Sequence, residues 1–276
     1  MARNVPYFDV MSFSAYDKCY KLYLNRHANY ILITMTKILV TGTSAGGIGE
    51  YIVRYLLKNT HAEVIGVARR AAEYGDRYTH IQGDITNAET LEKIKAAVGD
   101  KLEGAIFNAG VLGDLARIES SDVDGVKKVF EINYFAPILL TKALLPALRA
   151  AKGRAIYTSS LASDHVIQGW TAYSGSKAAL NSFVGILGAE EPEIVALAID
   201  PGVVDTPMQT SIREEQLHKL SKEDQKQFSE FKERGLLVNP EDSGKAFGNL
   251  VLGAKKEWSG KFLPWNDPDF NCLTLS

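Results

Sequence analysis

Tyr173 and Lys177 lie four positions apart in the stretch AYSGSK, and no other tyrosine in the sequence has a lysine at that spacing. Residues four apart on a helix share one face, so the Lys177 ammonium would lie beside the Tyr173 phenol. A free tyrosine has a pKa of about 10, and a neighbouring positive charge stabilises its phenolate. Lowering that pKa to about 7 takes about 4 kcal/mol. We then expect Tyr173 to donate a proton to a carbonyl oxygen as a general acid.

Two serines, Ser159 and Ser160, end the strand-like stretch GRAIYTSS just before this pair. A hydroxyl at the end of that strand would hold the substrate oxygen by a hydrogen bond while Tyr173 delivers the proton. The chemistry therefore requires a strand end and a helix face that meet at one place, and the rest of the chain has to supply that frame.

A glycine-rich loop, TGTSAGG, lies between the apolar run KILV and the amphipathic stretch IGEYIVRYLLKN. Glycines in a strand-to-helix turn let a phosphate approach the backbone, and the helix N-terminus offers it N–H groups and a partial positive charge. This context favours dinucleotide binding over a plain tight turn, which is the structural alternative. The glycines concerned are Gly42, Gly46, Gly47 and Gly49.

The second apolar run, EVIGVA, ends with Ala68 where dinucleotide-binding folds carry an acidic residue, and Arg69 and Arg70 follow it. A carboxylate there would bind a ribose 2′-hydroxyl and repel a 2′-phosphate, whereas a guanidinium binds the phosphate through two parallel hydrogen bonds. The alternative is a pair of solvated surface arginines. The sequence favours NADP(H), with Arg69 as the stronger candidate.

Strand-like apolar runs alternate with amphipathic helical stretches, which predicts an α/β Rossmann-type fold with a doubly wound parallel sheet in a single domain. Strands are predicted at 37–40, 63–68, 79–84, 102–110, 153–160, 193–202 and 260–265, and helices at 48–59, 89–98, 123–151, 172–187 and 240–252. Pro137 is expected to kink the long helix over 123–151.

The chain has 276 residues, of which 46% are hydrophobic, and a formal charge of −2 at pH 7. This suits one globular domain with a sizeable core, and gives no electrostatic attraction to nucleic acid or to an anionic membrane. No apolar run approaches the roughly 20 residues that span a bilayer. The two cysteines, Cys19 and Cys272, form no disulfide or metal framework, which favours a reducing, cytoplasmic compartment.

Residues 1–34 differ from the remainder of the chain: they contain five tyrosines and scattered charges without a clear amphipathic period. They also lack the apolar core and cleavage site of a signal peptide. We interpret them as a disordered extension or the product of an upstream start site. The folded domain is expected to cover residues 35–276.

Residues 208–235 are charged and only weakly helical. We expect them to form a small lid over the substrate, with an ordinary solvated helix pair as the alternative. Trp170, Val204 and Met208 are the candidates for the substrate pocket, although plain core positions fit each of them equally well. His165 is expected to be a solvated loop residue rather than one that faces the substrate.

Seven short motifs occur in the order found in short-chain dehydrogenases/reductases: TGTSAGGIG, GDIT, NAG, EINYFAP, TSS, YSGSK and DPGVVDT. The chain resembles this family from about residue 35 onward. The resemblance implies a catalytic tetrad of Asn133, Ser160, Tyr173 and Lys177, in which Ser160 is selected because it lies 13 residues before Tyr173. Asn133 would hold a proton-relay water, and Lys177 would also bind the nicotinamide ribose.

The same resemblance implies where the cofactor binds, with the NAG turn at the adenosine ribose, Asp84 at the adenine and Thr206 at the nicotinamide end. The implied cofactor-binding residues are Gly42, Gly46, Gly47, Ile48, Gly49, Arg69, Asp84, Ile85, Asn108, Ala109, Gly110, Tyr173, Lys177, Pro201, Gly202, Val204 and Thr206. The glycine loop is one residue longer than the family's G-x-x-x-G-x-G, and Gly46 is expected to absorb the extra length at positive φ.

Within the family, the stretches AALNSF, DPGVVDTPMQTSIRE and SGKFLPWND resemble the sepiapterin-reductase-like branch and fungal-type benzil reductases. This implies NADPH-dependent reduction of one carbonyl of a bulky or aromatic 1,2-diketone to an (S)-α-hydroxy ketone. Pro264 stands where pterin reductases carry an anchoring aspartate, and Asp267 follows three residues later, which disfavours a pterin substrate.

Two alternatives remain open from the sequence. One is an NADP-dependent oxidoreductase of another ketone or secondary alcohol, including pterin-type carbonyls, and the other is a non-catalytic NADP-binding sensor. The partner that we expect is a small carbonyl compound. Relatives associate through their long helices, here 123–151 and 173–188, so the resemblance also implies a homo-oligomer, either a dimer or a tetramer.

Overall fold

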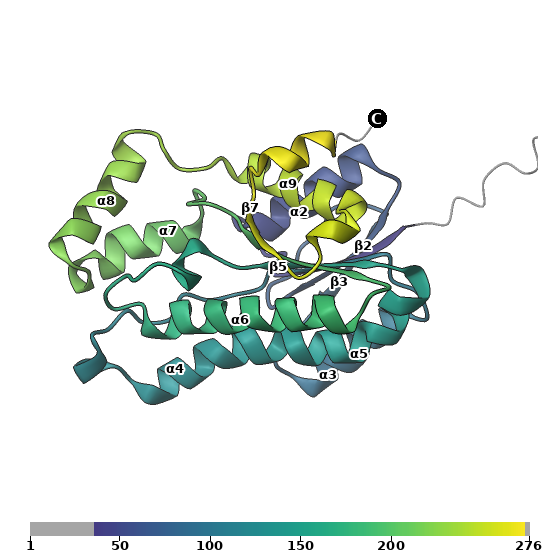
Figure 1. Ribbon diagram of the computed structural model, residues 1–276, viewed down its shortest axis with the longest axis horizontal. Coiled ribbons are helices and arrows are strands. Elements are labelled where there is room, and N and C mark those ends of the chain that lie inside the picture. Colours follow the sequence, from purple (N-terminus) through teal and green to yellow (C-terminus); the bar gives the residue numbers. More distant parts are fainter. Residues whose placement is uncertain (1–35, 274–276) are drawn as a thin grey trace, which may run out of the picture. The chain divides into compact units, whose positions relative to one another are not determined.

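A seven-stranded parallel sheet forms the centre of the described domain. The computed structural model describes residues 36–273 (Figure 1), so the extension predicted at residues 1–34 lies outside the described residues. The strands lie in the order β3-β2-β1-β4-β5-β6-β7, and every neighbouring pair is parallel. Their bounds are β1 Lys37–Thr41, β2 Glu63–Ala68, β3 Tyr78–Gln82, β4 Gly104–Phe107, β5 Arg154–Thr158, β6 Val195–Asp200 and β7 Phe262–Pro264.

Helices cover both faces of this sheet, which confirms the predicted doubly wound architecture (Figure 1). One face carries α2 Ile48–Asn59 and α9 Pro240–Gly253, and the other carries α3 Ala88–Val98, α4 Val123–Phe130, α5 Ala136–Ala151 and α6 Thr171–Glu190. The strand order reverses between β1 and β4. In open α/β sheets the crevice at such a reversal, outside the carboxyl ends of the strands, is where ligands bind.

Strand β6 shows how the sequence divides its side chains between two cores. All six of its residues are buried, as expected for a strand with helices on both faces. Because successive side chains point to opposite faces, Ala196 and Ala198 join the core that includes residues of α3, α5 and α6. Leu197 and Ile199 join the core that includes residues of α2 and α9.

The long helix predicted over 123–151 is interrupted by a wider turn. Helix α4 ends at Phe130, residues Glu131–Phe135 form a π-helical turn, and α5 begins at Ala136. Pro137 has no N–H to bond the carbonyl of Asn133, which lies four residues earlier, so the regular helical ladder cannot continue there. The predicted irregularity is present, but as a π turn before the proline rather than a simple kink.

The same stretch qualifies the expectation about membranes. By length and composition, Val123–Ala151 is a candidate membrane span, with a mean hydropathy of 1.2 in its most apolar window. The sequence contains no continuous apolar run of membrane-spanning length, as we expected. This helical stretch, which also contains polar residues, is nevertheless long and apolar enough to be a candidate. In this structure Leu140, Leu144 and Leu148 of the stretch are buried in the protein core.

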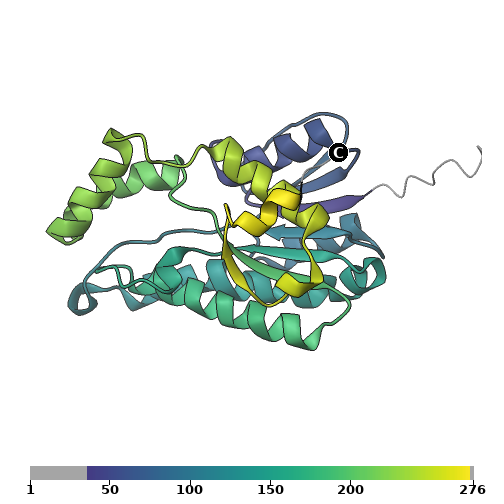
Figure 2. The same cartoon turned by 45° about the horizontal axis from the view of Figure 1, so that its top comes forward.

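Residues 207–233, between β6 and α9, form a separate group of short helices beyond the carboxyl edge of the sheet (Figure 2). They comprise α7 Pro207–Ser211, a π turn Ile212–Gln216, a 3-10 turn Leu217–Lys219 and α8 Lys222–Glu233. The buried Gln216 side chain ties this group to the loop after β4. Its Oε1 accepts a hydrogen bond from the Leu115 N–H at 2.8 Å, and its Nε2 donates to the Gly113 carbonyl at 3.2 Å.

Candidate active site

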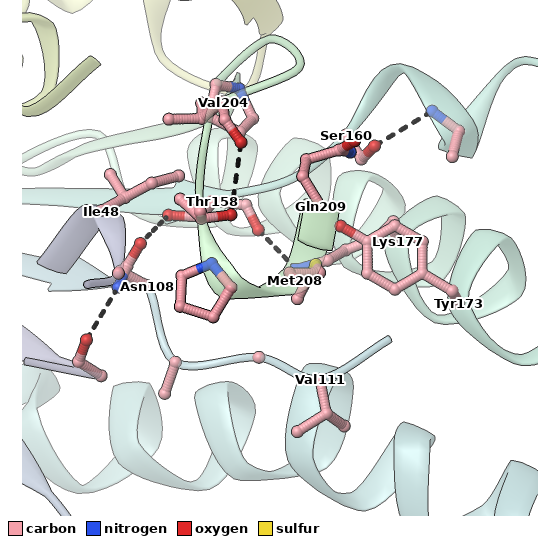
Figure 3. A pocket seen from close by; sticks show the side chains of 18 of the residues that line it. Ile48, Asn108, Val111, Thr158, Ser160, Tyr173, Lys177, Val204, Met208 and Gln209 are labelled. Atoms are coloured by element: carbon pink, nitrogen blue, oxygen red, sulfur yellow. Dashed lines mark hydrogen bonds between the residues drawn. The ribbon is translucent and has the colours of Figure 1, made fainter. Parts of the chain in front are cut away.

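A cavity of about 660 Å³ opens at the carboxyl edge of the sheet. Figure 3 shows Ile48 and Asn108 on one side of it, and Ser160, Tyr173 and Lys177 on the other. The predicted site residues that line the cavity are Gly42, Gly47, Ile48, Arg69, Asp84, Ile85, Asn108, Ala109, Gly110, Ser160, Tyr173, Lys177, Pro201, Gly202, Val204 and Thr206. The lining does not include Gly46, Gly49 or Asn133.

Tyr173 and Lys177 lie one turn apart on α6, and 9% and 3% of their surfaces are exposed. The Lys177 Nζ donates a hydrogen bond to the Thr158 carbonyl at 2.7 Å and lies 5.6 Å from the centre of the Tyr173 ring. Strand β5 ends at Thr158, so its last carbonyl anchors the ammonium. The sequence spacing thus brings the two side chains together, as we expected, at the end of a strand.

The two serines that follow β5 occupy different environments. Ser159 is fully buried, and its N–H donates to the Ile199 carbonyl at 2.7 Å, which extends the pairing with β6. Ser160 lines the cavity, and its hydroxyl accepts a hydrogen bond from the Ala162 N–H at 3.2 Å. Only Ser160 of this pair is placed to reach a substrate.

Asn133 acts on the site from behind the cavity wall. In the π turn its side chain is buried, and it forms two bonds with the backbone of Val111: Oδ1 accepts from the N–H at 2.9 Å and Nδ2 donates to the carbonyl at 2.8 Å. A Cβ on Gly110 would lie 3.3 Å from the Asn133 Oδ1 and 3.6 Å from the Lys177 Nζ. Asn133 therefore fixes the loop after β4 next to the Lys177 ammonium.

Burial shifts the pKa values of the two central groups in opposite directions. Desolvation raises the pKa of Tyr173 to about 12, against a lowering effect of the Ser160 hydroxyl. Desolvation also lowers the pKa of Lys177 to about 8. Burial is the largest cause acting on the pKa of Tyr173 in the ligand-free protein, and the Lys177 ammonium bonds to the Thr158 carbonyl. Tyr173 is accordingly a protonated phenol. Acidification of Tyr173 by Lys177 together with the positive charge of a bound, oxidised nicotinamide stays a prediction.

The glycine loop fits a bound dinucleotide. Gly42 has φ +77°, and a Cβ on Gly49 would collide with the Gly42 carbonyl oxygen, so both positions require glycine for the close contact of loop and helix. A Cβ on Gly47 would meet only the Ser44 carbonyl, at 3.6 Å. Gly47 is the N-cap of α2 and provides no side-chain cap, so the helix N-terminus suits a phosphate.

The extra residue of this loop is held by the helix that follows it. Gly46 has φ +83°, as we expected, and its N–H donates to the Glu50 Oε2 at 2.7 Å. Arg54, one turn further along α2, donates from Nε to the Glu50 Oε1 at 2.8 Å. The Glu50 carboxylate therefore fixes the added length of the loop.

The loops after β2, β3 and β4 form the part of the cavity next to the glycine loop. The Asn108 side chain donates to the Gly42 carbonyl at 3.3 Å, which joins the β4 end to the glycine loop. Arg69 is exposed and lines the cavity, as does Arg70. The Asp84 Oδ1 accepts two hydrogen bonds from Thr86, one from the N–H at 3.0 Å and one from the hydroxyl at 2.8 Å.

Comparison with known proteins identifies the family. The family model described as short chain dehydrogenase matches residues 36–217. An uncharacterized oxidoreductase of Schizosaccharomyces pombe is 38% identical over 239 residues, which cover 83% of this chain and 95% of that protein. The chain belongs to the short-chain dehydrogenase family.

Two further relatives support this membership. A benzil reductase ((S)-benzoin forming) of Saccharomyces cerevisiae is 33% identical over 252 residues, or 83% of this chain and 95% of that protein. The crystal structure of a short chain dehydrogenase/reductase from the same yeast is 35% identical with a TM-score of 0.82, covering 87% of this chain and 100% of that one. This short-chain dehydrogenase is therefore an oxidoreductase with a fold that binds a nicotinamide cofactor.

The part of the cavity next to α8 is aromatic. The Trp170 ring stacks on Phe228 of α8, with centroids 5.6 Å apart, and meets the Tyr173 ring edge-on at 5.5 Å. Val204 and Met208 also line the cavity. The three predicted pocket residues thus lie at the cavity, and the buried Phe228 excludes a purely solvated helix pair for 208–235.

His165 is a solvated loop residue, as we expected, and it also lines the cavity. Its side chain is exposed. The Nδ1 donates a hydrogen bond to the Leu161 carbonyl at 3.0 Å. A histidine at the mouth of the cavity is solvated and still within reach of what enters.

Sequence reasoning missed several residues of this cavity. Phe228 and Phe231 line it from α8, and their spacing of three inside a charged segment is the signal that indicates a buried face. Asp200 also lines it, at the end of β6. Its motif, DPGVVDT, was identified from the sequence, but an aspartate at a strand end is usually solvated, so the type alone gave no sign of burial.

Proposed function

We propose that this short-chain dehydrogenase is an NADPH-dependent carbonyl reductase. Its substrate would be a bulky or aromatic 1,2-diketone of the benzil type, and its product an (S)-α-hydroxy ketone. The observation that carries the proposal is a single cavity in which Ser160, Tyr173 and Lys177 lie between the glycine loop and an aromatic wall. The similarity to a yeast benzil reductase supports the same substrate class.

NADPH, when bound, supplies the hydride that reduces the carbonyl carbon. Tyr173 donates its phenolic proton to the carbonyl oxygen, and its burial keeps that proton in place until the oxygen becomes basic. Ser160 orients the same oxygen by a hydrogen bond. Lys177 binds the nicotinamide ribose and is held in position by the Thr158 carbonyl. Proton and hydride together convert the ketone to the alcohol.

The aromatic wall supports a bulky, apolar substrate. One side of the cavity is lined by Trp170, which directly precedes α6, by Met208 of α7, and by Phe228 and Phe231 of α8. Aromatic rings stack on one another with a gain beyond their buried area, so a phenyl group on the substrate would be bound there by stacking. Such a wall offers few polar partners, which disfavours sugars and other polyols.

The first experiment supplies the purified protein with NADPH and benzil or 1-phenyl-1,2-propanedione. We expect the absorbance of reduced nicotinamide to fall, and chiral chromatography to detect the (S)-hydroxy ketone. Tyr173→Phe should abolish turnover but retain NADPH binding. Tyr55→Phe is the matched control, because its hydroxyl bonds Asn249 on α9 away from the cavity, at 2.6 Å. Turnover by Tyr173→Phe would contradict the assigned acid, and NADPH binding without turnover of any carbonyl would favour a sensor.

The preference for NADPH is proposed from Arg69, which lies at the cavity opening beyond the end of β2. Arg69→Asp replaces a phosphate ligand by a carboxylate that repels phosphate and accepts from a ribose hydroxyl. We expect NADPH affinity to fall by about tenfold or more, the size of one lost charged hydrogen bond, and NADH affinity to rise. Arg234→Asp, the same charge change on the distant end of α8, should leave both affinities unchanged.

We also propose a homo-oligomer located in the cytoplasm. Phe135, Leu139 and Ile186 are exposed apolar side chains near and on the two long helices through which relatives associate. The exposed free thiol of Cys272 is compatible with a reducing compartment. Light scattering on the purified protein tests the first proposal, and imaging of a fluorescent fusion tests the second.

A further inference from the structure

Thr43 is a fully buried residue of the glycine loop, and its backbone and its side chain are both bonded within the protein. Its N–H donates to the Val67 carbonyl at 3.4 Å, and its carbonyl accepts from the Tyr74 hydroxyl at 3.0 Å. Its own hydroxyl lies 2.9 Å from the Tyr78 hydroxyl, within hydrogen-bond distance. Thr43 does not line the cavity, whereas the next residue, Ser44, does. The loop is therefore held from behind the cavity wall.

Tyr78 reaches this loop across a glycine in the neighbouring strand. Gly66 lies inside β2, and a Cβ there would collide with the Tyr78 ring and hydroxyl. A glycine in a strand interior often marks such a close approach. The Tyr78 hydroxyl also lies 3.2 Å from the Nδ1 of His80, two residues further along β3. The missing side chain at Gly66 thus leaves the space in which Tyr78 meets Thr43.

Tyr74 joins this cluster to the residues that hold the extra length of the loop. Its ring meets the Tyr78 ring edge-on at 4.8 Å, and the Arg54 guanidinium lies 5.3 Å from its centre. Arg54 also bonds the Glu50 carboxylate, which accepts from the Gly46 N–H. Burial raises the pKa of Tyr78 and raises that of Tyr74 to about 12, so both phenols stay protonated. One connected set of side chains thus holds the start of the loop and its inserted part.

We propose that Tyr74 and Tyr78 are positioning residues that hold Thr43 and thereby order the glycine loop for the phosphates of the nicotinamide cofactor. Neither tyrosine is among the described residues that line the cavity, so both act through the loop. A loop that is ordered in advance loses little conformational freedom when the cofactor binds, which strengthens binding. The proposal concerns the pyrophosphate that NADPH and NADH share. It rests on the nicotinamide-binding fold of the family and not on the proposed carbonyl substrate.

The test removes the hydroxyl of Tyr78 and keeps its ring, in Tyr78→Phe. Titration followed by the fluorescence of reduced nicotinamide measures the Kd of NADPH and the Kd of NADH. We expect both Kd values to rise by about threefold to tenfold, as for the loss of one hydrogen bond, and their ratio to stay that of the wild type. Arg69→Asp has a different signature, because it should change that ratio.

Hydrogen exchange of the ligand-free protein measures the order of the loop directly. Peptides that cover residues 42–47 should exchange faster in Tyr78→Phe than in the wild type, while peptides from β5 should exchange at the wild-type rate. The β5 peptides exclude a general loss of stability. Tyr55→Phe is the matched control, because its hydroxyl bonds Asn249 at 2.6 Å, away from the loop. This control should keep both Kd values and the wild-type exchange of the loop.

Two further variants identify the bonds themselves. Thr43→Val removes the other hydroxyl of the Thr43–Tyr78 pair at nearly the same shape. The double variant Thr43→Val/Tyr78→Phe should bind NADPH no more weakly than the weaker single variant, because each change breaks the same bond. Tyr74→Phe breaks the separate bond to the Thr43 carbonyl. It should also weaken NADPH and NADH by equal factors.

The proposal is overturned if Tyr74→Phe and Tyr78→Phe both fold and bind the two cofactors as the wild type does. It is also overturned if neither variant folds, since the tyrosines would then be structural residues only, or if the binding of NADPH alone becomes weaker. Failure of the proposed function looks different: the wild type would bind NADPH and reduce no carbonyl. Weaker binding of both cofactors together with faster exchange of the loop, absent from Tyr55→Phe, supports the proposal.

Discussion

Replacement of Lys177 by methionine tests whether burial lowers the pKa of the Lys177 ammonium and so makes the stability of the protein depend on pH. Lys177 is 3% exposed, and burial lowers its pKa from 10.5 to about 8. The unfolded chain therefore binds this proton more tightly than the folded protein does. The cost to stability is present in full below about pH 8, and is released as the pH rises toward 10.5. At about 1.36 kcal/mol per pH unit, the full cost is about 3 kcal/mol.

Between about pH 8 and about pH 9.5, release of this cost should raise the free energy of unfolding by about 1 to 2 kcal/mol. Tyrosines begin to ionise in the unfolded chain at about pH 9, one unit below their ordinary pKa, but they are present in the wild type and in Lys177→Met alike, so the difference between the two slopes isolates Lys177. Urea unfolding of the ligand-free protein at several pH values in this window measures the change. Lys177→Met also loses the bond to the Thr158 carbonyl. That loss lowers the free energy of unfolding of Lys177→Met by the same amount at every pH. The quantity to compare between the two proteins is therefore the slope of the free energy of unfolding against pH.

The slope of the wild type should exceed that of Lys177→Met by the stated amount. Lys58→Met, which removes an exposed lysine near the end of α2, should keep the wild-type slope. Parallel curves for the wild type and Lys177→Met would refute the reasoning. They would mean that water or a nearby anion stabilises the Lys177 ammonium inside the protein, so that its burial costs no free energy.

Two other substitutions test the loop and the aromatic wall. Gly49→Ala should lower the melting temperature and abolish NADPH binding, because its Cβ would collide with the Gly42 carbonyl; Gly47→Ala, with only a 3.6 Å contact, should keep the wild-type melting temperature in differential scanning fluorimetry. Phe228→Ala should raise KM for an aromatic diketone while leaving the NADPH Kd unchanged, since Phe228 stacks on Trp170 on the substrate side. Unchanged KM would contradict that assignment of the wall.

The N-terminal two thirds of the fold could be predicted because its signals are local. The helix Ile48–Asn59 and the strand Glu63–Ala68 were predicted with these bounds, since a glycine loop precedes one and apolar runs define both. The segment 208–235 gave no comparable period. Its buried residues are few, and they contact distant parts of the chain, as Gln216 does with the loop after β4. Such contacts leave no periodic pattern in the sequence.

The site divides in the same way. The spacing of Tyr173 and Lys177 and the strand before them predicted that these groups meet, because helix geometry is set locally. The pKa values could not be predicted, because desolvation depends on how completely other elements cover the two side chains. Asp200 was overlooked for the same reason. Its residue type suggests solvent, and only the packing of β6 against its neighbours makes it a buried charge.

The longer glycine loop shows how one added residue is accommodated without loss of the phosphate site. Gly47 is the N-cap of α2, so Glu50 occupies the third helical position. A glutamate there commonly reaches back to the N-cap N–H. Here it reaches one residue further, to the Gly46 N–H, and Arg54 offsets its charge. The carboxylate thus binds the inserted part of the loop, while the uncapped first turn of α2 still presents its N–H groups to a phosphate.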